Sequence, residues 1–408
     1  MEAPITLAAI ETAQTVVLRH VSTLGTERVP LADALDRVTA EPVVCDTDYP
    51  PFDKSMMDGF AIHDPSGQTR FHIVGQVAAG SVFERALAGG EAVQINTGAA
   101  VPPGTTAVVP VENVEIGGGG SFVSIRSTVM TGAHVESRGR YVHAGDVVIT
   151  AGQRMTPARM AVAAAVGAAE VVVYRRPRVA ILVTGNELVD VSQTPGPGRI
   201  RNSNGPMLNA LLRSDGISPV DLGACPDERP ALRERMARGL DADVFCISGG
   251  VSMGTLDLVP EVLAGLGVQV MIRKWAIRPG KPGLFGVHQS GCRVFALAGN
   301  PVGCFVAYWL LVRPAIRVMC GLPGGIGMLV SARLDGRCPA TADRAAFLPA
   351  RLALTDAGEW RVALVPWNGS GDLFGFGAAN ALVARPPHTG EASAGADVRV
   401  HPLEHGYE

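Results

Sequence analysis

The chain has 408 residues, more than a single hydrophobic core usually organises, so two to four domains are expected. Hydrophobic residues make up 47% of the chain and charged residues only 18%, a composition that excludes extensive disorder. The net charge of −3 gives no general attraction for nucleic acid, and no basic run is interleaved with aromatic residues, so an anion site has to be local.

Neither a membrane span nor a secretory signal is expected. The apolar stretches 160–169 and 303–312 are each closed by a charge and are too short to cross a bilayer. The N-terminal Met-Glu-Ala-Pro lacks a basic region followed by an apolar core, which predicts a cytoplasmic protein. The seven scattered cysteines contain no C-x-x-C pair and predict reduced, mostly buried thiols rather than disulfides or a zinc site.

The pattern of apolar and polar residues changes twice within the first 175 residues. Apolar residues recur at helical spacing through 5–40, around a break at Gly25 and Pro30, which predicts a helical arm. Short alternating segments separated by glycines then predict a small β-rich domain that ends near residue 140. An extended segment at 147–149 and an Ala-rich helix at 157–166 follow, and we expect them to pack back on the arm.

Residues 177–320 alternate between strand-like and helix-like runs. The strands are predicted at 179–183, 244–247 and 294–297, and the helices at 205–215, 228–240, 256–266 and 302–319. This alternation predicts an α/β layer with a largely parallel sheet. From residue 321 to about residue 402 the residue pattern again predicts short strands, which indicates a last, β-rich domain.

Glycine-bearing segments follow all three predicted strands of the α/β layer. They are Thr-Gly-Asn-Glu-Leu at 184–188, Ser-Gly-Gly-Val-Ser-Met-Gly at 248–254 and Ala-Gly-Asn-Pro at 298–301. Ligands of open α/β sheets bind beyond the carboxyl ends of strands, where backbone N–H groups of such turns bind anions. One glycine turn alone is equally consistent with a tight turn, but three in one domain favour a phosphate or oxyanion pocket.

Cations and carboxylates accompany these turns. Lys274, Arg278 and Lys281 surround a turn stiffened by two prolines, which suits a charged phosphate, although a solvated surface turn is the alternative. The acidic candidates are Asp58, Glu187, Asp227 and Asp257, of which Glu187 and Asp257 follow predicted strand ends. Carboxylates in a phosphate site usually hold Mg²⁺, whereas singly each is more often a cap or a surface charge.

Several other functions are disfavoured. The sequence contains neither G-x-x-x-x-G-K-[ST] nor G-x-S-x-G, which argues against a P-loop NTPase and an α/β-hydrolase. The histidines show no metal-ligand spacing, and we interpret them and Tyr141 as structural.

Taken in order, the motifs resemble those of the molybdopterin molybdenumtransferases of molybdenum-cofactor synthesis, the MoeA and gephyrin E-domain type. The matching pieces span nearly the whole chain. They are Ser-Met-Met-Asp-Gly-Phe-Ala at 55–61, Asn-Thr-Gly-Ala at 96–99, the segments at 184–188 and 248–254, Arg-Pro-Gly-Lys-Pro at 278–282 and Gly-Asn-Pro-Val at 299–302.

The resemblance implies a multidomain α/β plus β fold: an elongated homodimer of four-domain subunits. Its parts would be a helical arm in two segments (1–45 and 141–175), a β-rich inserted domain (46–140), a molybdopterin-adenylyltransferase-like α/β pterin-binding domain (176–325) and a C-terminal β domain (326–408). The implied reaction takes adenylylated molybdopterin and molybdate, with Mg²⁺, and yields molybdenum cofactor and AMP. Other proteins of cofactor synthesis are possible partners by the same resemblance, and nucleic acid and membranes are not.

The resemblance also assigns roles to residues of this chain. The catalytic set would be Asp58, Glu187, Asp227, Asp257, Lys274 and Lys281, with Glu187 and Asp257 as Mg²⁺ ligands. The substrate-binding set would be Thr97, Thr184, Ser248, Gly249, Gly250, Ser252, Arg278, Pro282, Asn300, Pro301 and Ser370. Asp58 and Thr97 would face the cleft from the inserted domain, and Ser370 would contribute to the oxyanion site from the C-terminal domain.

The chain departs from the family pattern around the expected molybdate site. Gly303 stands where the family has Ser, and Pro349 where it has the Arg of Phe-x-Arg-Gly. Losing a charged hydrogen-bond partner costs about 1.5–3 kcal/mol, so we hypothesise weaker molybdate binding unless Arg344 or Arg351 replaces the lost guanidinium. Asn186, Tyr141 and Arg278 are milder departures, from Asp, Asp and Lys respectively.

Two alternatives to the transferase remain open at this point. One is a divergent paralogue that uses another oxyanion or pterin, and the other is a pterin-binding scaffold without turnover. A replacement donor near Pro349 and Gly303 would favour the transferase, whereas an empty apolar site there would favour the alternatives.

Overall fold

The computed structural model describes residues 3–64, 67–126, 129–251, 258–325 and 329–403. The chain forms two compact units, and each is described by itself. The larger unit comprises Met1–Glu27 and Tyr174–Glu408, and the smaller unit comprises Arg28–Val173.

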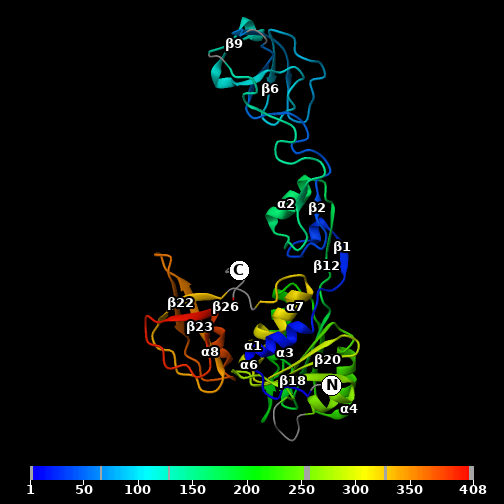
Figure 1. Cartoon of the computed structure of the whole chain (residues 1–408), viewed down its shortest axis with the longest axis vertical. Coiled ribbons are helices and arrows are strands. Elements are labelled where there is room, and N and C mark those ends of the chain that lie inside the picture. The colour runs from blue at the N-terminus through cyan, green and yellow to red at the C-terminus, as the bar shows by residue number, and fades with distance from the viewer. Residues whose placement is uncertain (1–2, 65–66, 127–128, 252–257, 326–328, 404–408) are drawn as a thin grey trace. The chain divides into compact units, whose positions relative to one another are not determined.

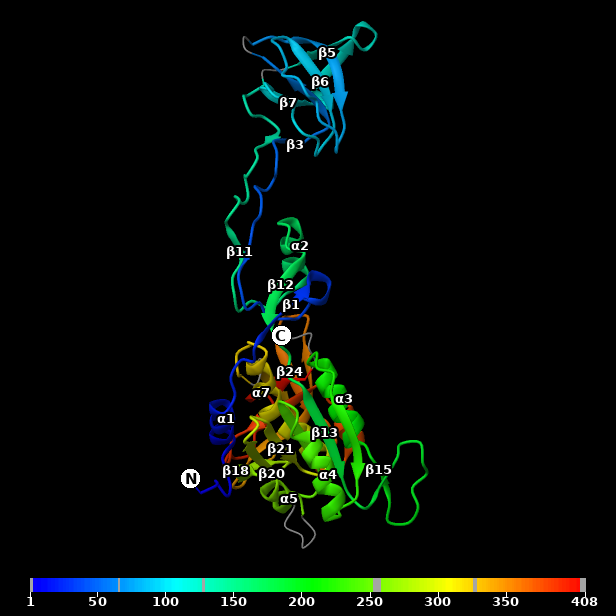
Figure 2. The ribbon, with the colours of Figure 1, turned by 90° about the vertical axis from the view of Figure 1, so that its right-hand side faces the viewer.

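The larger unit contains the predicted α/β layer (Figure 2). Its six-stranded sheet has the order β16-β13-β17-β21-β20-β18, in which the first four strands are mutually parallel and β20 pairs antiparallel with both of its neighbours, β21 and β18. The strands are β13 (Val179–Thr184), β16 (Val220–Cys225), β17 (Val244–Ser248), β18 (Val268–Lys274), β20 (Pro282–His288) and β21 (Arg293–Leu297). The short strands β14 (Leu188–Val189) and β15 (Ile200–Arg201) pair beside the sheet.

Helices cover both faces of this sheet, which explains why the central strands carry apolar residues on both faces instead of alternating with polar ones. Ile181 of β13 shares a core cluster with Leu208, and its neighbour Leu182 shares the opposite cluster with Leu232. The helices are α1 (Ile10–Arg19), α3 (Asn204–Ser214), α4 (Arg229–Gly239), α5 (Val259–Gly265), α6 (Pro301–Ala307), the π-helical turn η4 (Tyr308–Val312) and α7 (Arg313–Met319). The predicted strands and helices of residues 177–320 are therefore confirmed.

One long apolar helix belongs to this core. Pro301–Met319 is long and apolar enough to cross a membrane, but 83% of it is buried inside the protein. Its composition is accounted for by packing against the sheet and α1.

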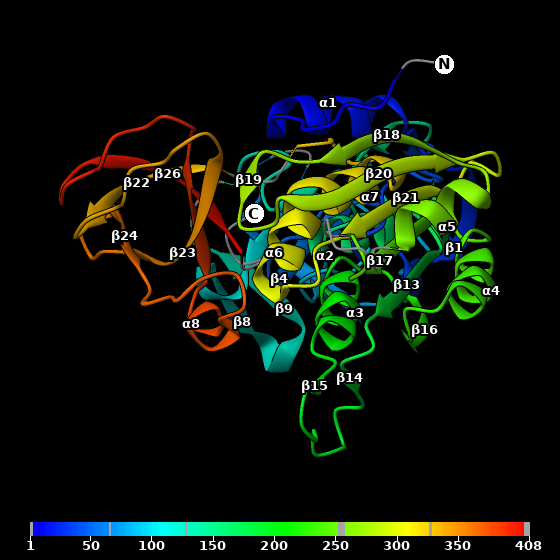
Figure 3. The same cartoon turned by 90° about the horizontal axis from the view of Figure 1, so that it is seen from below.

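The C-terminal residues form a β-barrel (Figure 3). The pairing order β23-β24-β22-β26-β25 closes through β25 and β23, and β19 adds to β23. The elements are β19 (Ile277–Arg278), β22 (Val330–Asp335), β23 (Ala345–Leu354), β24 (Trp360–Leu364), α8 (Leu373–Gly377), β25 (Ala381–Arg385) and β26 (Asp397–Pro402). Because β19 lies in the chain between β18 and β20 of the α/β sheet and pairs with β23, it ties the barrel to that layer.

The smaller unit contains a second six-stranded sheet, of order β7-β4-β6-β5-β9-β8 (Figure 1). Its elements, together with those that lead into and out of it, are β1 (Thr26–Pro30), η1 (Leu31–Asp33), β2 (Val43–Val44), β3 (Lys54–Ser55), β4 (Gly59–Ile62), β5 (Arg70–Val77), β6 (Glu91–Ile95), β7 (Ala107–Pro110), η2 (Val111–Asn113), β8 (Val114–Gly117), η3 (Gly118–Gly120), β9 (Phe122–Ile125), β10 (Val135–Glu136), β11 (Val147–Ile149), α2 (Pro157–Ala165) and β12 (Glu170–Tyr174). The β-rich character and the helix at 157–166 are confirmed.

The prediction of helix through residues 5–40 is largely wrong. Only Ile10–Arg19 and the short 3-10 turn Leu31–Asp33 are helical, because Thr26–Pro30 forms a strand that pairs with β12. The helix α1 also packs against α7 in the larger unit rather than within the arm. Residues 28–45 and 141–175 do pack together, as expected, around Val43, Met155 and Val171.

The structure confirms the prediction of reduced, mostly buried thiols. All seven cysteines are free, and six of them are buried.

Candidate functional site

A cavity of about 1200 Å³ opens in the larger unit at the carboxyl ends of β13, β17 and β21. The segments that follow these three strands form one wall, and the barrel contributes the opposite wall through Trp367, Ser370 and Phe374. The location is the one expected for a ligand of an open α/β sheet. It also confirms that the three glycine-bearing strand ends lie together.

A buried hydrogen-bond network forms the cavity floor. The Asn204 side-chain amide donates to Ser248 Oγ at 2.8 Å and to the Gly299 carbonyl at 2.7 Å, and Ser248 Oγ donates to the Ala298 carbonyl at 3.2 Å. Asn204 is 6% exposed and Ser248 is fully buried. The network therefore fixes the ends of β17 and β21 relative to α3.

Two acceptors on this floor have no partner among the described residues. They are Thr184 Oγ1 and Asn204 Oδ1, and both are buried. Because an unsatisfied buried polar atom is costly, these atoms are suited to a ligand or to ordered water in the cavity. Sequence reasoning did not single out Asn204, so its place on the cavity floor was missed.

Glycine is required at the end of β17. Gly249 has φ +102° and Gly250 has φ +62°, in the left-handed region. A Cβ at Gly249 would collide with the Thr184 carbonyl, so the strand ends approach too closely for any side chain. Ser252 follows this turn and lies outside the described residues.

Two of the predicted acids line the cavity, namely Glu187 and Asp227. The Glu187 carboxylate lies over Gly185, where a Cβ would be 2.7 Å from both of its oxygens, and the carboxylate has no hydrogen-bond partner in the described part of the chain. Asn186 Oδ1 accepts the Asp227 backbone N–H at 3.0 Å, so the asparagine supplies an acceptor as the family's aspartate would. Asp257 lies outside the described residues.

The predicted cations divide into two groups. Arg278 and Lys281 line the cavity beside Pro282, and both are exposed. Lys274 is half-buried at the end of β18, where its carbonyl accepts the Ala8 N–H at 2.9 Å, and it does not line the cavity. Arg199, Arg201 and Arg344 line the cavity instead, and sequence reasoning named only Arg344, as a replacement.

The barrel side of the cavity is joined to the start of α6. Asn300 Nδ2 donates to Ser370 Oγ at 2.9 Å, and the Val302 N–H donates to the Ser370 carbonyl at 3.1 Å. Asn300, Pro301 and Ser370 all line the cavity, so the sequence correctly brought them together. Phe374 stands at the rim and is 94% exposed.

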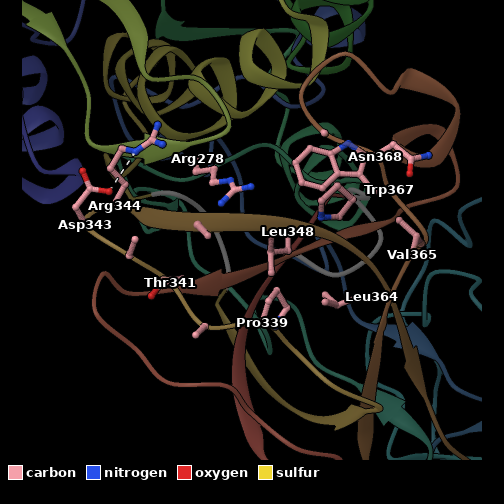
Figure 4. Close-up of a pocket in the computed structure, with 15 residues that line it drawn as sticks. Arg278, Pro339, Thr341, Asp343, Arg344, Leu348, Leu364, Val365, Trp367 and Asn368 are labelled. Carbon is pink, nitrogen blue, oxygen red and sulfur yellow. Dashed lines mark ion pairs between the residues drawn. The ribbon is translucent and has the colours of Figure 1, made fainter.

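A second cavity, of about 490 Å³, adjoins the first and contains the position of the missing family arginine. Figure 4 shows its lining, with Pro349 among the residues drawn and Leu348, Leu364 and Trp367 labelled. Arg344 borders both cavities, whereas Arg351 donates to the Ala378 carbonyl at 3.2 Å and lines neither. Position 349 itself is thus apolar, and of the two arginines considered only Arg344 lines this cavity.

Asp58 and Thr97 lie in the smaller unit and are in contact with each other. The Thr97 N–H donates to Asp58 Oδ1 at 2.8 Å, and the Asn96 side-chain amide donates to the same oxygen at 3.3 Å. These hydrogen bonds, the one from Thr97 first, lower the pKa of Asp58 below its ordinary value. Asp58 therefore remains a carboxylate at neutral pH.

The cavity carboxylates fit Mg²⁺ in a substrate-assisted site. Among the described residues, no cluster of three or more His, Cys, Asp or Glu could hold a metal by itself. Mg²⁺ usually takes one or two carboxylates together with water and substrate phosphates, and Glu187 and Asp227 supply such oxygens.

The thiol of Cys304 in α6 is not a nucleophile at neutral pH. Burial raises its pKa to about 12, so it stays protonated.

Comparison with known proteins gives the same order of parts. Three family models match the chain: the MoeA N-terminal region (domain I and II) over residues 8–167, a probable molybdopterin binding domain over 180–318, and the MoeA C-terminal region (domain IV) over 331–403.

Individual relatives cover most of the chain. The molybdopterin molybdenumtransferase of Staphylococcus aureus strain MRSA252 is 34% identical over 381 residues, which cover 91% of this chain and 89% of the relative. That of Bacillus subtilis strain 168 is 37% identical over 305 residues, covering 72% and 70%. The crystal structure of the molybdopterin biosynthesis MoeA protein from Pyrococcus horikosii matches with a TM-score of 0.82 and 30% identity, over 98% of this chain and 100% of that one. The chain therefore belongs to the MoeA family of molybdopterin molybdenumtransferases.

Proposed function

We propose that this protein inserts molybdate into adenylylated molybdopterin and releases AMP, with Mg²⁺ as cofactor. As a member of its family it is a transferase of molybdenum-cofactor biosynthesis. The observation that carries the proposal is the convergence of three strand ends, two acids and several cations on one cavity of about 1200 Å³. A cavity of this size and polarity suits a large, phosphate-bearing heterocycle.

The proposed mechanism is electrostatic. Arg278 and Lys281 hold anionic groups of the substrate, and Ser370 and Asn300 donate hydrogen bonds at the barrel wall. Bound Mg²⁺ would neutralise charge that develops on the phosphoanhydride. Glu187 and Asp227 would hold the Mg²⁺ ion in place, with Asp257 as a further ligand. No covalent nucleophile is needed.

The remaining roles are also proposals. Thr184, Ser248, Gly249, Gly250 and Ser252 would contact the pterin-bearing substrate. Lys274 would act from outside the cavity lining, through residues that border the cavity. We further infer a cytoplasmic homodimer in which Asp58 and Thr97 of one copy complete the cleft of the other.

The apolar surroundings of Pro349 favour a second candidate function. A divergent paralogue could use another oxyanion or pterin, because the family's guanidinium at position 349 is absent. A pterin-binding scaffold without turnover is the remaining alternative. In the transferase molybdate drives release of AMP, whereas in either alternative it does not.

The experiment is AMP release from adenylylated molybdopterin by the purified protein with Mg²⁺, at increasing molybdate. We expect molybdate-dependent release that falls at least about tenfold in Glu187→Gln, because an Mg²⁺-competent carboxylate is lost. Glu234→Gln is the matched control, since Glu234 is exposed on α4 and does not line the cavity. Tight pterin binding without release at any molybdate concentration would replace the transferase proposal with the scaffold.

A further inference from the structure

The second cavity has the properties of a small-molecule site in its own right. It encloses about 490 Å³, within the range of pockets that bind small organic ligands. It shares Arg278, Arg344, Trp367 and Gly369 with the main cavity, and its remaining lining comes from the C-terminal residues 339–369.

Most of its wall is apolar. Leu348 is 9% exposed and Ala346 5% exposed, and they belong to the core cluster of the barrel. The other apolar lining residues are Pro339, Ala340, Ala342, Pro349, Leu364 and Val365. An inorganic oxyanion placed against this wall would lose hydration without gaining hydrogen bonds, so the wall favours an apolar ligand body.

The polar groups at one side are donors that lack strong acceptors. The Arg278 side chain has no hydrogen-bond or ion-pair partner among the described residues. Arg344 reaches the Ile277 carbonyl only at 3.4 Å and Asp343 Oδ1 only at 3.7 Å, and this aspartate is 72% exposed. The Trp367 indole N–H is buried and likewise has no acceptor in the described part of the chain.

Figure 4 shows how these groups are arranged. Arg278 and Arg344 lie along one side of the cavity, Trp367 lies on another, and Leu348, Leu364 and Pro339 lie across from the guanidinium groups. The lining thus combines an apolar floor with an edge that holds two guanidinium groups and one carboxylate, that of Asp343 beside Arg344. A complementary ligand carries its negative charge at one end and an apolar ring at the other.

We propose that this second cavity binds a small organic acid, a carboxylate on a compact aromatic or alicyclic ring. The carboxylate pairs with Arg278 and Arg344, and the ring packs on Leu348, Pro349 and Trp367. Since both arginines also border the main cavity, a bound acid competes there for the cations that hold anionic substrate groups. The proposal concerns the protein alone and does not depend on transferase activity.

The test uses the full chain without pterin, with benzoate and cyclohexanecarboxylate as probes in calorimetric titration. We expect dissociation constants of about 1 mM or tighter, given the size of the probes. Acetate lacks the ring and benzamide lacks the charge, so each is expected to bind at least about tenfold more weakly. Equal binding of benzoate and acetate, or of benzoate and benzamide, would overturn the proposal.

Variants locate the site. Arg344→Gln should weaken benzoate binding at least about tenfold, because one of two guanidinium partners is removed. Arg351→Gln is the matched control, since this arginine lies on β23, the strand that begins directly after Arg344, and lines neither cavity. Equal losses in the two variants, or none in Arg344→Gln, would contradict the assignment.

A second variant acts on the apolar end without touching the charge. Leu364→Trp should fill part of the cavity and weaken cyclohexanecarboxylate binding while the protein keeps its thermal unfolding temperature. Unchanged binding in a folded Leu364→Trp protein would show that the probes bind elsewhere. Failure of these tests leaves AMP release unaffected, so the two proposals fail separately.

Discussion

Gly303, at the start of α6, packs directly against Gly280 in the turn that carries Arg278 and Lys281. A Cβ at Gly303 would lie 3.0 Å from Gly280 Cα and 3.1 Å from its nitrogen, tighter than ordinary packing. Gly280 in turn has φ +102°, and a Cβ there would lie 2.8 Å from the Gly303 carbonyl oxygen. The loss of the family's serine at this position therefore coincides with a close backbone contact that holds the cationic turn against α6.

The first prediction follows from this contact. Gly303→Ser should not simply restore a hydroxyl for molybdate, because its Cβ pushes on the Gly280 backbone. We expect destabilisation of about 1–3 kcal/mol, typical of overpacking, and no tighter molybdate binding. Thermal unfolding and calorimetric titration measure both. Gly196→Ser is the control, since position 196 is open. A stable Gly303→Ser protein that binds molybdate more tightly would show that the turn can move.

A second prediction concerns the cavity floor. Asn204→Ala removes both donations of the side-chain amide and leaves the buried Ser248 hydroxyl short of a donor, so stability should fall by about 1–3 kcal/mol. AMP release should fall as well, because the ends of β17 and β21 lose their common support. Asn209→Ala, on the same helix but half-buried and bonded only to Arg213, serves as the control. Equal unfolding temperatures for the two variants would refute this role.

The third prediction tests the buried ion pair between Asp215, which follows α3, and Arg313 of α7. Arg313 Nε donates to Asp215 Oδ1 and the Tyr308 hydroxyl donates to Asp215 Oδ2, both at 2.8 Å, and the two charged side chains are 3% and 9% exposed. Asp215→Ala should cost about 3–5 kcal/mol, because it removes the carboxylate that pairs with a buried guanidinium, and Tyr308→Phe only about 1 kcal/mol.

An exposed pair provides the comparison for that experiment. Arg229 and Glu261 form an ion pair at 2.9 Å with side chains more than half exposed, and removing it should change stability by less than about 1 kcal/mol. Denaturant unfolding of Asp215→Ala and Glu261→Ala measures the difference. Similar free energies of unfolding for the two variants would mean that the buried pair is solvated.

The fourth prediction concerns pH. Burial, with a smaller contribution from Arg399, lowers the pKa of His401 to about 4, and its Nδ1 has no partner among the described residues. The folded state thus keeps His401 neutral, while an unfolded histidine takes up a proton near pH 6.5. The stabilisation is present above pH 6.5 and is lost as the pH falls toward 4, amounting to about 3 kcal/mol.

His401→Leu should therefore show a smaller loss of stability between pH 7 and pH 4.5 than the unaltered protein. Scanning calorimetry across this range measures the loss, and NMR titration of the histidine ring reports its pKa directly. His143, with a 71% exposed side chain, is the control position, and His143→Gln should keep the pH dependence of the unaltered protein. A His401 resonance that titrates near pH 6.5 in the folded protein would reject the explanation.

The sequence alone was sufficient where local patterns carry the information. Strands such as 244–247 and the helices of 177–320 were predicted correctly, because apolar periodicity and flanking glycines are local signals. The grouping of Thr184, Ser248 and Asn300 also followed, since the carboxyl ends of parallel strands meet at one edge of a sheet. The same reasoning failed for residues 26–30, whose pairing with β12 is a contact between distant segments.

Other properties were decided by the tertiary structure. Lys274 precedes Arg278 by four residues, yet only Arg278 lines the cavity, because Lys274 ends β18 in the α/β sheet whereas Arg278 belongs to β19, which pairs with the barrel. The floor role of Asn204 and the position of Arg344 beside both cavities depend on packing between residues tens of positions apart. The sequence determined which elements form and which strand ends carry the chemistry, because those signals lie within short stretches of the chain. Only the folded chain decided which charges share a cavity, because that depends on how separate elements pack.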